Sequence, residues 1–334
     1  MTAFIPRSVG RGKLALVPLS LLCAGLLAGV GGYLLFPRSP EVRFVEYRMP
    51  ELHDAPIAIA AAPDGTIWFT IDRADAIGRI RAGRLERLPT SGPNIEPTGL
   101  GIGQDGSAWF TDMAARAIAR IGPTGEVSRF TLDTPIVRLG RLVVAPEGAA
   151  WFAESTRSSI TRLKDGSFTR YQVEPSRGGP YGVAVAPDGS VWATLQSGNQ
   201  LLRINAAGKV ENLEIPRPGA LPTDVATGSD GSVWFLQFRA NRIGRWRSGT
   251  FDDFEIGGEN AGLSGLAVAP DKSVWFGMLR RSSLGRLRDG KIKAFKLPRD
   301  NARPYTLVID PVGNVWYADI TGYIGMLPAD QISD

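Results

Sequence analysis

Cysteine and histidine are almost absent from this chain of 334 residues, which has one of each, Cys23 and His53. Beyond residue 40 there is no cysteine, so that region can form no disulfide and perform no thiol catalysis. A zinc site of the usual cysteine and histidine type is excluded there for the same reason.

A large excess of charge of one sign is also lacking once the first forty residues are set apart. The 38 basic and 33 acidic residues give a net charge of +5. Residues 1–40 hold no acid and four basic residues, Arg7, Arg11, Lys13 and Arg38, so the remainder has 34 basic side chains against 33 acidic ones. Nucleic-acid binding needs a concentrated basic surface, so we predict no nucleic-acid partner.

Residues 1–40 contain the long hydrophobic run. Leu14–Phe36 is 23 residues without a charge and follows the basic residues, which suits a membrane-crossing helix with its basic end in the cytoplasm. We expect an uncleaved anchor that leaves residues 41–334 outside the cytoplasm, in the periplasm or at the cell surface. The alternative is a signal peptide and secretion after cleavage. Leu22 before Cys23 matches a lipoprotein signal poorly.

A tryptophan returns seven times after residue 40. The positions are Trp68, Trp109, Trp151, Trp192, Trp234, Trp275 and Trp316, with gaps of 41 or 42 residues. Each lies in a related phrase, such as PDGTIWFT, PDGSVWAT or SDGSVWFL. A period in the low forties, built from short apolar runs and glycine-rich turns, predicts a seven-bladed β-propeller of four-stranded antiparallel blades, an all-β fold.

One repeat shows the expected blade. Residues 181–186 (YGVAVA) form an apolar innermost strand, and the PDG turn at 187–189 reverses the chain into the strand SVWAT. Residues 201–204 (LLRI) and the more polar residues 210–215 form the two outer strands. The last repeat has no convincing fourth strand after residues 323–327, so we expect residues 42–49 to pair there and close the ring.

Features that recur in every blade are expected to be architectural. The tryptophans should fill space between blades, and Asp64, Asp105, Asp188 and Asp230 suit tight turns. An arginine recurs in the third strand of six blades, at Arg79, Arg120, Arg162, Arg203, Arg245 and Arg286. We interpret these arginines as blade-to-blade hydrogen-bond donors, and a basic ring that contacts a substrate is the alternative.

Function should lie where the repeats differ. Strand one begins at the face where strand two ends, so two positions per blade are expected to meet around the mouth of the central channel. The first positions are Ile57, Thr98, Gly140, Tyr181, Thr223, Ser264 and Tyr305. The second positions are Ile71, Asp112, Glu154, Leu195, Gln237, Met278 and Asp319.

The phrases P-x-G-L/V, PDGxxWFT and IGRI at this period resemble the virginiamycin B lyase (streptogramin lyase) family over the whole chain after residue 40. The resemblance implies a seven-bladed propeller that opens the ester of a cyclic depsipeptide by elimination, with Mg²⁺, a histidine and a glutamate at the channel mouth. The family's histidine positions correspond to Ser264 and Tyr305, and its glutamate to Asp319. Because neither histidine is present, the family mechanism lacks its usual base.

Two functions follow as competing hypotheses, with a scaffold role in an envelope assembly as a third. The first is a membrane-tethered propeller that binds a peptide, glycan or protein partner at its mouth. The second is a divergent metal-dependent lyase or hydrolase in which Asp112, Glu154 and Asp319 hold Mg²⁺ or Ca²⁺. Its alternative is that these acids pair with nearby mouth arginines, such as Arg116, Arg157, Arg280, Arg281 or Arg303. The candidate mouth residues are Thr98, Asp112, Glu154, Tyr181, Gln237, Ser264, Arg281, Tyr305 and Asp319.

Overall fold

A computed structural model describes residues 42–51, 53–72, 74, 76–90, 95–134, 138–174 and 178–332. The expected membrane segment and Cys23 lie outside these residues. Within the described part of the chain, no helix is long and apolar enough to cross a membrane.

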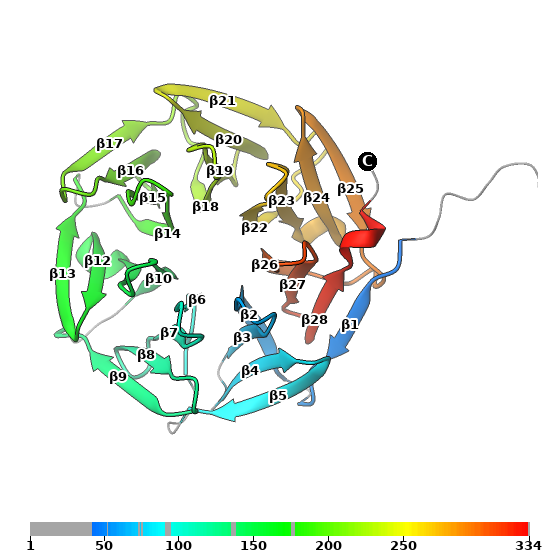
Figure 1. The fold of residues 1–334 in the computed structure, drawn as a ribbon. Coiled ribbons are helices and arrows are strands. Elements are labelled where there is room, and N and C mark those ends of the chain that lie inside the picture. The colour runs from blue at the N-terminus through cyan, green and yellow to red at the C-terminus, as the bar shows by residue number, and fades with distance from the viewer. Residues whose placement is uncertain are drawn as a thin grey trace, which may run out of the picture. The chain divides into compact units, whose positions relative to one another are not determined.

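Seven four-stranded antiparallel sheets are arranged as blades around a central axis (Figure 1). The innermost strands are β2 (Ala55–Ala61), β6 (Leu100–Ile102), β10 (Leu139–Val144), β14 (Pro180–Val185), β18 (Pro222–Thr227), β22 (Leu263–Val268) and β26 (Pro304–Ile309). The second strands are β3 (Ile67–Asp72), β7 (Ala108–Asp112), β11 (Ala150–Glu154), β15 (Val191–Leu195), β19 (Val233–Gln237), β23 (Val274–Met278) and β27 (Val315–Asp319).

The outer half of each blade follows the same order. The third strands are β4 (Ala76–Arg81), β8 (Ala117–Ile121), β12 (Ser159–Lys164), β16 (Gln200–Ile204), β20 (Arg242–Arg247), β24 (Ser283–Arg288) and β28 (Tyr323–Leu327). The outermost strands are β5 (Arg84–Pro89), β9 (Val127–Thr131), β13 (Ser167–Gln172), β17 (Val210–Glu214), β21 (Thr250–Glu255), β25 (Lys291–Lys296) and β1 (Val45–Arg48). Short 3₁₀ turns are η1 (Ser155–Arg157), η2 (Leu279–Arg281) and η3 (Ala329–Gln331).

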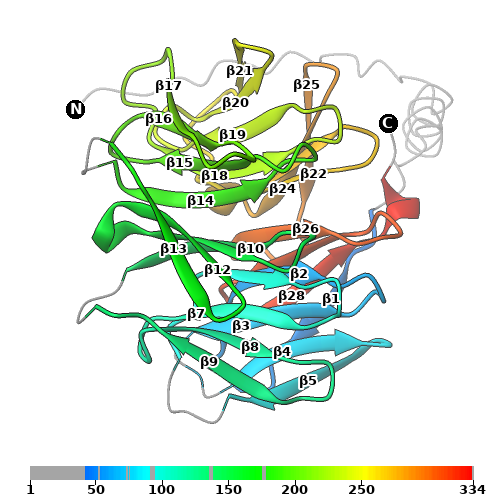
Figure 2. The ribbon, with the colours of Figure 1, turned by 60° about the vertical axis from the view of Figure 1, so that its left-hand side comes forward.

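The predicted ring closure is confirmed. Strand β1 pairs antiparallel with β28, so the first described strand completes the last blade (Figure 1). Figure 2 shows the same blades from the side, with β1 beside β28. The boundaries predicted for the blade of β14 to β17 agree with the structure to within one residue. The predicted seven-bladed, almost entirely β architecture is therefore correct.

The repeated tryptophans pack between blades, as predicted. Trp151 of the third blade, for example, lies in one buried cluster with Val183 and Leu195 of the fourth. In four blades the turn residues hold the indole as well: Asp105 accepts hydrogen bonds from the Ser107 amide and hydroxyl, and Ser107 Oγ accepts one from Trp109 Nε1 at 3.0 Å. These contacts confirm the turn role of the repeated aspartates.

For Arg79, Arg120, Arg203 and Arg245, the interpretation as blade-to-blade donors is wrong. Each of the repeated guanidinium groups lies over the tryptophan of its own blade, at 5.3 to 5.9 Å from the ring centroid. The pairing register explains this contact, because Trp68 and Arg79 are direct cross-strand partners and the other blades repeat the arrangement. Four of the arginines also bond an acid of their own blade, namely Glu86, Asp105, Asp188 and Asp252.

Candidate functional site

A register irregularity shapes the channel mouth. In β10, Leu139 opposes Glu154 and Leu142 opposes Phe152, so the inner strand carries one residue more than its partner. Strands β14 and β18 repeat the bulge over the same positions. A bulge re-aims the side chains within it, so in these strands two consecutive residues near the mouth can turn towards the axis.

Four side chains from four blades meet near the axis at this level. The hydroxyls of Tyr181 and Tyr305 lie 3.4 Å apart, although their blades are separated by two others. The Arg141 guanidinium lies 5.5 Å from the centroid of each tyrosine ring. Arg141 Nη2 is 3.6 Å from Asp224 Oδ2. We call these four residues the axial cluster.

The axial cluster is largely buried and incompletely hydrogen-bonded. Arg141 and Asp224 expose 12% and 15% of their side chains, and Arg141 donates a bond of 3.2 Å to the Thr98 carbonyl. Among the described residues, Arg141 Nε and the Thr223 hydroxyl have no partner. Unsatisfied polar atoms in a buried cluster are costly, and their presence at a channel mouth marks a candidate binding site.

The electrostatics of the cluster follow from burial. Burial raises the pKa of Asp224 above its ordinary value, although Arg141 and backbone amides act in the opposite direction. Arg141 by itself would lower the pKa of Tyr181, but burial and the neighbouring Tyr305 outweigh it, so that pKa is raised. Tyr181 is therefore a neutral phenol near neutral pH.

The channel continues below the axial cluster as an apolar tunnel of about 320 Å³ that Arg141 and Asp224 also line. One aliphatic residue per blade faces it, and each is 5 to 8% exposed: Ile59, Leu100, Leu142, Val183, Val225, Leu266 and Leu307. The axial cluster thus separates this tunnel from a smaller cavity of about 200 Å³ at the mouth.

The mouth cavity has a larger neighbour of about 550 Å³ between the sixth and seventh blades. Phe238, Leu279 and Tyr305 line both cavities, so together they form one groove across this face. Ile320 adds to the apolar wall of the larger part, and Arg280 and Arg303 lie at its edge. We call the two cavities together the mouth groove.

The second predicted column does not face the channel. Asp112, Glu154, Gln237 and Asp319 are at most 2% exposed and point into their own blades. Asp112 lies 3.9 Å from Arg129, and Gln237 donates to Asp253 at 2.9 Å. The prediction failed because these side chains, at the end of the second strand, point towards the outer strands of their own blades and not towards the channel.

Glu154 is the clearest case of an internal acid. It is fully buried and accepts bonds of 3.1 Å from both Arg170 Nε and Thr161 Oγ1. Arg157 Nε lies 3.3 Å from its other carboxylate oxygen. The predicted alternative, in which such acids pair with arginines, therefore holds for Glu154, and Arg157 is among the arginines that the sequence suggested.

Asp319 belongs to the ring closure. Its Oδ2 accepts a 2.6 Å bond from Arg299, which also donates to both carboxylate oxygens of Glu46 in β1. Tyr317 donates to Glu46 at 3.1 Å, and the Arg299 guanidinium lies 3.6 Å from the Tyr323 ring centroid. This network joins the closing strand to the last blade.

Three further candidates have structural roles. Thr98 Oγ1 donates to the Leu139 carbonyl at 2.8 Å, and Ser264 Oγ donates to the Pro304 carbonyl at 2.5 Å, so each hydroxyl links its blade to the next. Arg281 donates to the carbonyls of Gly257 and Glu259. Of the nine predicted residues, Tyr181, Ser264 and Tyr305 line the mouth groove.

The carboxylates predicted to hold Mg²⁺ or Ca²⁺ do not fit one ion. Asp112, Glu154 and Asp319 each contact an arginine of their own blade or of the ring closure, and a guanidinium competes directly with a cation. Within the described ranges, no three acidic, histidine or cysteine residues are grouped as metal ligands would be. His53 is exposed in the turn before β2 and lines neither part of the mouth groove.

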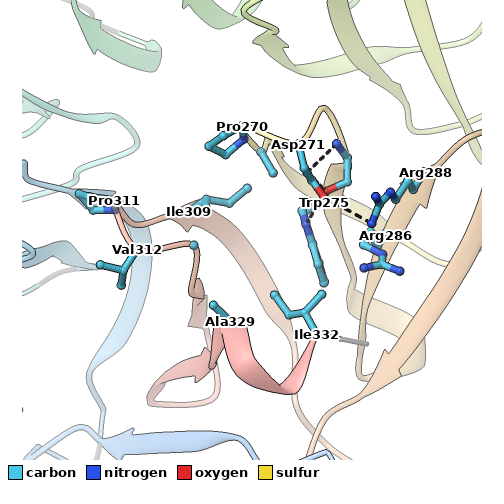
Figure 3. Close-up of a pocket in the computed structure, with 13 residues that line it drawn as sticks. Pro270, Asp271, Trp275, Arg286, Arg288, Ile309, Pro311, Val312, Ala329 and Ile332 are labelled. Atoms are coloured by element: carbon cyan, nitrogen blue, oxygen red, sulfur yellow. Dashed lines mark hydrogen bonds and ion pairs between the residues drawn. The ribbon is translucent and has the colours of Figure 1, made fainter. Parts of the chain in front are cut away.

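A separate cleft of about 370 Å³ lies on the opposite face (Figure 3). Its walls come from the turns at Pro270 and Pro311, from Trp275, and from Ala329 and Ile332 at the end of the chain (Figure 3). Asp271 bridges the Ser273 hydroxyl and Arg288 there. This cleft lies between the same two blades as the mouth groove but at the other end of the strands.

Comparison with known proteins places the chain in a family. The model of the virginiamycin B lyase family matches residues 38–163 and 83–332. The chain belongs to the virginiamycin B lyase family. Virginiamycin B lyase of Nocardia farcinica (strain IFM 10152) is 33% identical to it over 215 residues, which are 62% of this chain and 74% of that protein.

Solved structures of the family agree with the fold. A catalytically inactive histidine-to-alanine variant of virginiamycin B lyase from Staphylococcus aureus with quinupristin has a TM-score of 0.80 and 26% identity, and covers 85% of this chain and 98% of its own. A streptogramin B lyase structure has a TM-score of 0.82 and 25% identity, over 86% and 97% of the two chains. Family membership and these structures agree on the propeller fold.

Proposed function

We propose that this virginiamycin B lyase-like propeller binds a peptide ligand in its mouth groove without cleaving the ligand. The observation that carries the proposal is the state of the two histidine positions. The Ser264 hydroxyl is held by the Pro304 carbonyl, and the Tyr305 hydroxyl meets Tyr181. The general base that works near neutral pH is most often a histidine, and neither position holds one.

The groove itself supports ligand binding. It has an apolar and aromatic wall, formed by Phe238, Leu279, Tyr305 and Ile320, with polar groups at the edge. Its larger part has a volume within the range of known ligand sites, about 300–1,000 Å³. We favour a peptide over a glycan because this wall suits apolar side chains and because the related lyases act on a cyclic depsipeptide.

A divergent lyase is the second candidate, and Asp224 is the observation that favours it. A carboxyl group whose pKa is raised by burial, at the base of a groove, has the properties of a general base. Asp224 lines the mouth cavity beside the two tyrosines. This version of the enzyme hypothesis replaces the metal and the histidine with a single buried carboxylate.

We further propose that residues 14–36 tether the propeller outside the cytoplasm. The support is the uncharged run itself and the basic residues before it. Protease treatment of intact cells or spheroplasts should digest the propeller, and the protein should stay with membranes after a high-salt wash. Recovery in the soluble cytoplasmic fraction would contradict the proposal.

The binding proposal is tested by selecting ligands from a displayed library of short peptides with the purified protein. Phe238→Ala and Tyr305→Ala should each weaken the selected peptides by about tenfold or more, the effect expected for an aromatic hot spot. Val312→Ala is the control, because Val312 is 75% exposed at the opposite face. Selected peptides that bind all variants equally, while thermal unfolding shows intact folds, would refute binding at the mouth.

A further inference from the structure

Two arginines beside the mouth groove differ from the others on this face. Arg280 in η2 and Arg303 before β26 both line the larger part of the groove, and both are exposed. Among the described residues, neither side chain forms an ion pair or a hydrogen bond. By contrast, Arg281 and Arg299, which lie next to them in sequence or space, are fixed by carbonyls and carboxylates.

The acids near the groove do not compensate these two charges. Asp319 is bound by Arg299 at 2.6 Å, and Asp224 in the mouth cavity lies 3.6 Å from Arg141. Asp300 lines the groove, but its side chain is fully exposed and lies 3.4 Å from Lys296 Nζ. The edge of the groove therefore carries two uncompensated positive charges directly beside an apolar wall.

This combination determines what a ligand must offer. The wall of Phe238, Leu279 and Ile320 suits an apolar side chain, and the adjacent guanidinium groups suit an anion at a short distance from it. Arginine binds carboxylates through two parallel hydrogen bonds, which adds geometric selectivity to the charge attraction. A neutral ligand of the same shape would make the apolar contacts only.

We propose that the mouth groove selects peptides with a carboxylate next to an apolar side chain, and that Arg280 and Arg303 bind this carboxylate. The inference rests on the proposed peptide-binding function and deepens it. The carboxylate can be the C-terminus of the peptide or the side chain of an acidic residue, and both offer the same chemistry to the arginines.

Three N-acetylated hexapeptides with one apolar sequence ending in phenylalanine distinguish these sources. One has a free C-terminus, one is amidated, and one is amidated with a glutamate before the phenylalanine. Isothermal titration calorimetry at low and high salt measures their binding. We expect at least one carboxylate peptide to bind about tenfold more tightly than the neutral amide. The advantage should shrink as salt rises.

The variant Arg280→Gln/Arg303→Gln should remove the difference between the charged and neutral peptides. The matched control is Arg239→Gln, because Arg239 is exposed two residues after the end of β19, the position that Arg280 holds after β23. Arg239 lines neither part of the groove. Its substitution should leave the difference intact. Thermal unfolding should show that all variants are folded.

The inference is overturned by three results: equal binding of amide and carboxylate peptides, a charge preference that survives the double substitution, or no binding of either carboxylate peptide at millimolar concentration. The proposed function fails separately. If carboxylate and amide bind equally and both depend on Tyr305, peptide binding at the mouth stands and only the charge selectivity is wrong. If selected peptides bind independently of Tyr305 and Phe238, the proposed function itself is wrong.

Discussion

Two partly buried arginines, Arg299 and Arg141, show how one residue type serves architecture in one place and a candidate site in another. Arg299 donates to Glu46, Asp319 and Thr321 at distances between 2.6 and 3.2 Å. Arg141 donates one bond of 3.2 Å and lies 3.6 Å from its acid. The saturated network holds the ring closed, and the unsaturated one lies where a ligand can reach it.

The largest effect should come from breaking the saturated network. Arg299→Met removes the only charge partner described for the fully buried Asp319, and it also removes the ion pair that Glu46 of the closing strand makes. Leaving a buried carboxylate unpaired costs about 3–5 kcal/mol. Chemical denaturation should show this loss in the free energy of unfolding. Arg239→Met is the exposed control, and a loss below about 1 kcal/mol for Arg299→Met would show that the closure does not depend on this network.

Removing the charge of Arg141 from the axial cluster should lower the free energy of unfolding by less than removing the charge of Arg299. Arg141→Met leaves Asp224 buried without its cation, which we expect to cost about 1–3 kcal/mol. The double variant Arg141→Met/Asp224→Asn removes both charges and should lie within about 1 kcal/mol of the wild type. A double variant as unstable as Arg299→Met would mean that the axial pair is as structural as the closure.

The pH dependence of the free energy of unfolding tests the raised pKa of Asp224. Because burial raises the pKa of Asp224 in the folded protein, the folded state holds this proton more tightly than the unfolded state. Asp224 therefore costs stability as pH rises from its ordinary value of 3.8 through its folded value. Asp224→Asn should match the wild type at low pH and become the more stable protein towards neutrality. Parallel pH profiles of the two proteins would contradict the raised pKa.

The smallest change in stability should come from supplying a hydrogen-bond acceptor to Trp151 in the third blade. Trp151 Nε1 has no partner among the described residues, because Ala149 replaces the serine that accepts this bond in four other blades. Ala149→Ser should supply the acceptor and raise the free energy of unfolding by about 0.5–1.5 kcal/mol. Ala150→Ser, one residue along and buried in β11, is the control and should destabilise. If Ala149→Ser changes neither the tryptophan fluorescence of the protein nor its free energy of unfolding, the Trp151 indole needs no partner.

The fold was predictable because the tryptophan period is visible in the sequence and because residues 42–49 resemble the outermost strands. The site was only partly predictable. Tyr181 and Tyr305 were placed correctly, but Arg141 and Asp224 were missed because the bulge makes a second residue of each inner strand face the channel. The sequence held a signal for them: the corresponding residues of the other blades are small, namely Ala58, Gly99, Gly182, Gly265 and Thr306.

The second column failed for a related reason. The end of the second strand lies at the same face as the start of the first, but the structure turns the side chains of Asp112, Glu154 and Asp319 into the protein interior and away from the channel. Arginines on the outermost strands, such as Arg129 and Arg170, were the available signal, because a buried acid needs a charged partner within its own sheet. Sequence spacing alone does not show on which side of a strand that partner lies.

Incubation of quinupristin with the purified protein and Mg²⁺, followed by mass spectrometry, shows whether the mouth groove binds its ligand without catalysis. We expect the quinupristin ring to open no faster than in buffer without protein. Protein-dependent ring opening that Asp224→Asn abolishes would contradict this expectation and would make the propeller a lyase with a carboxylate base.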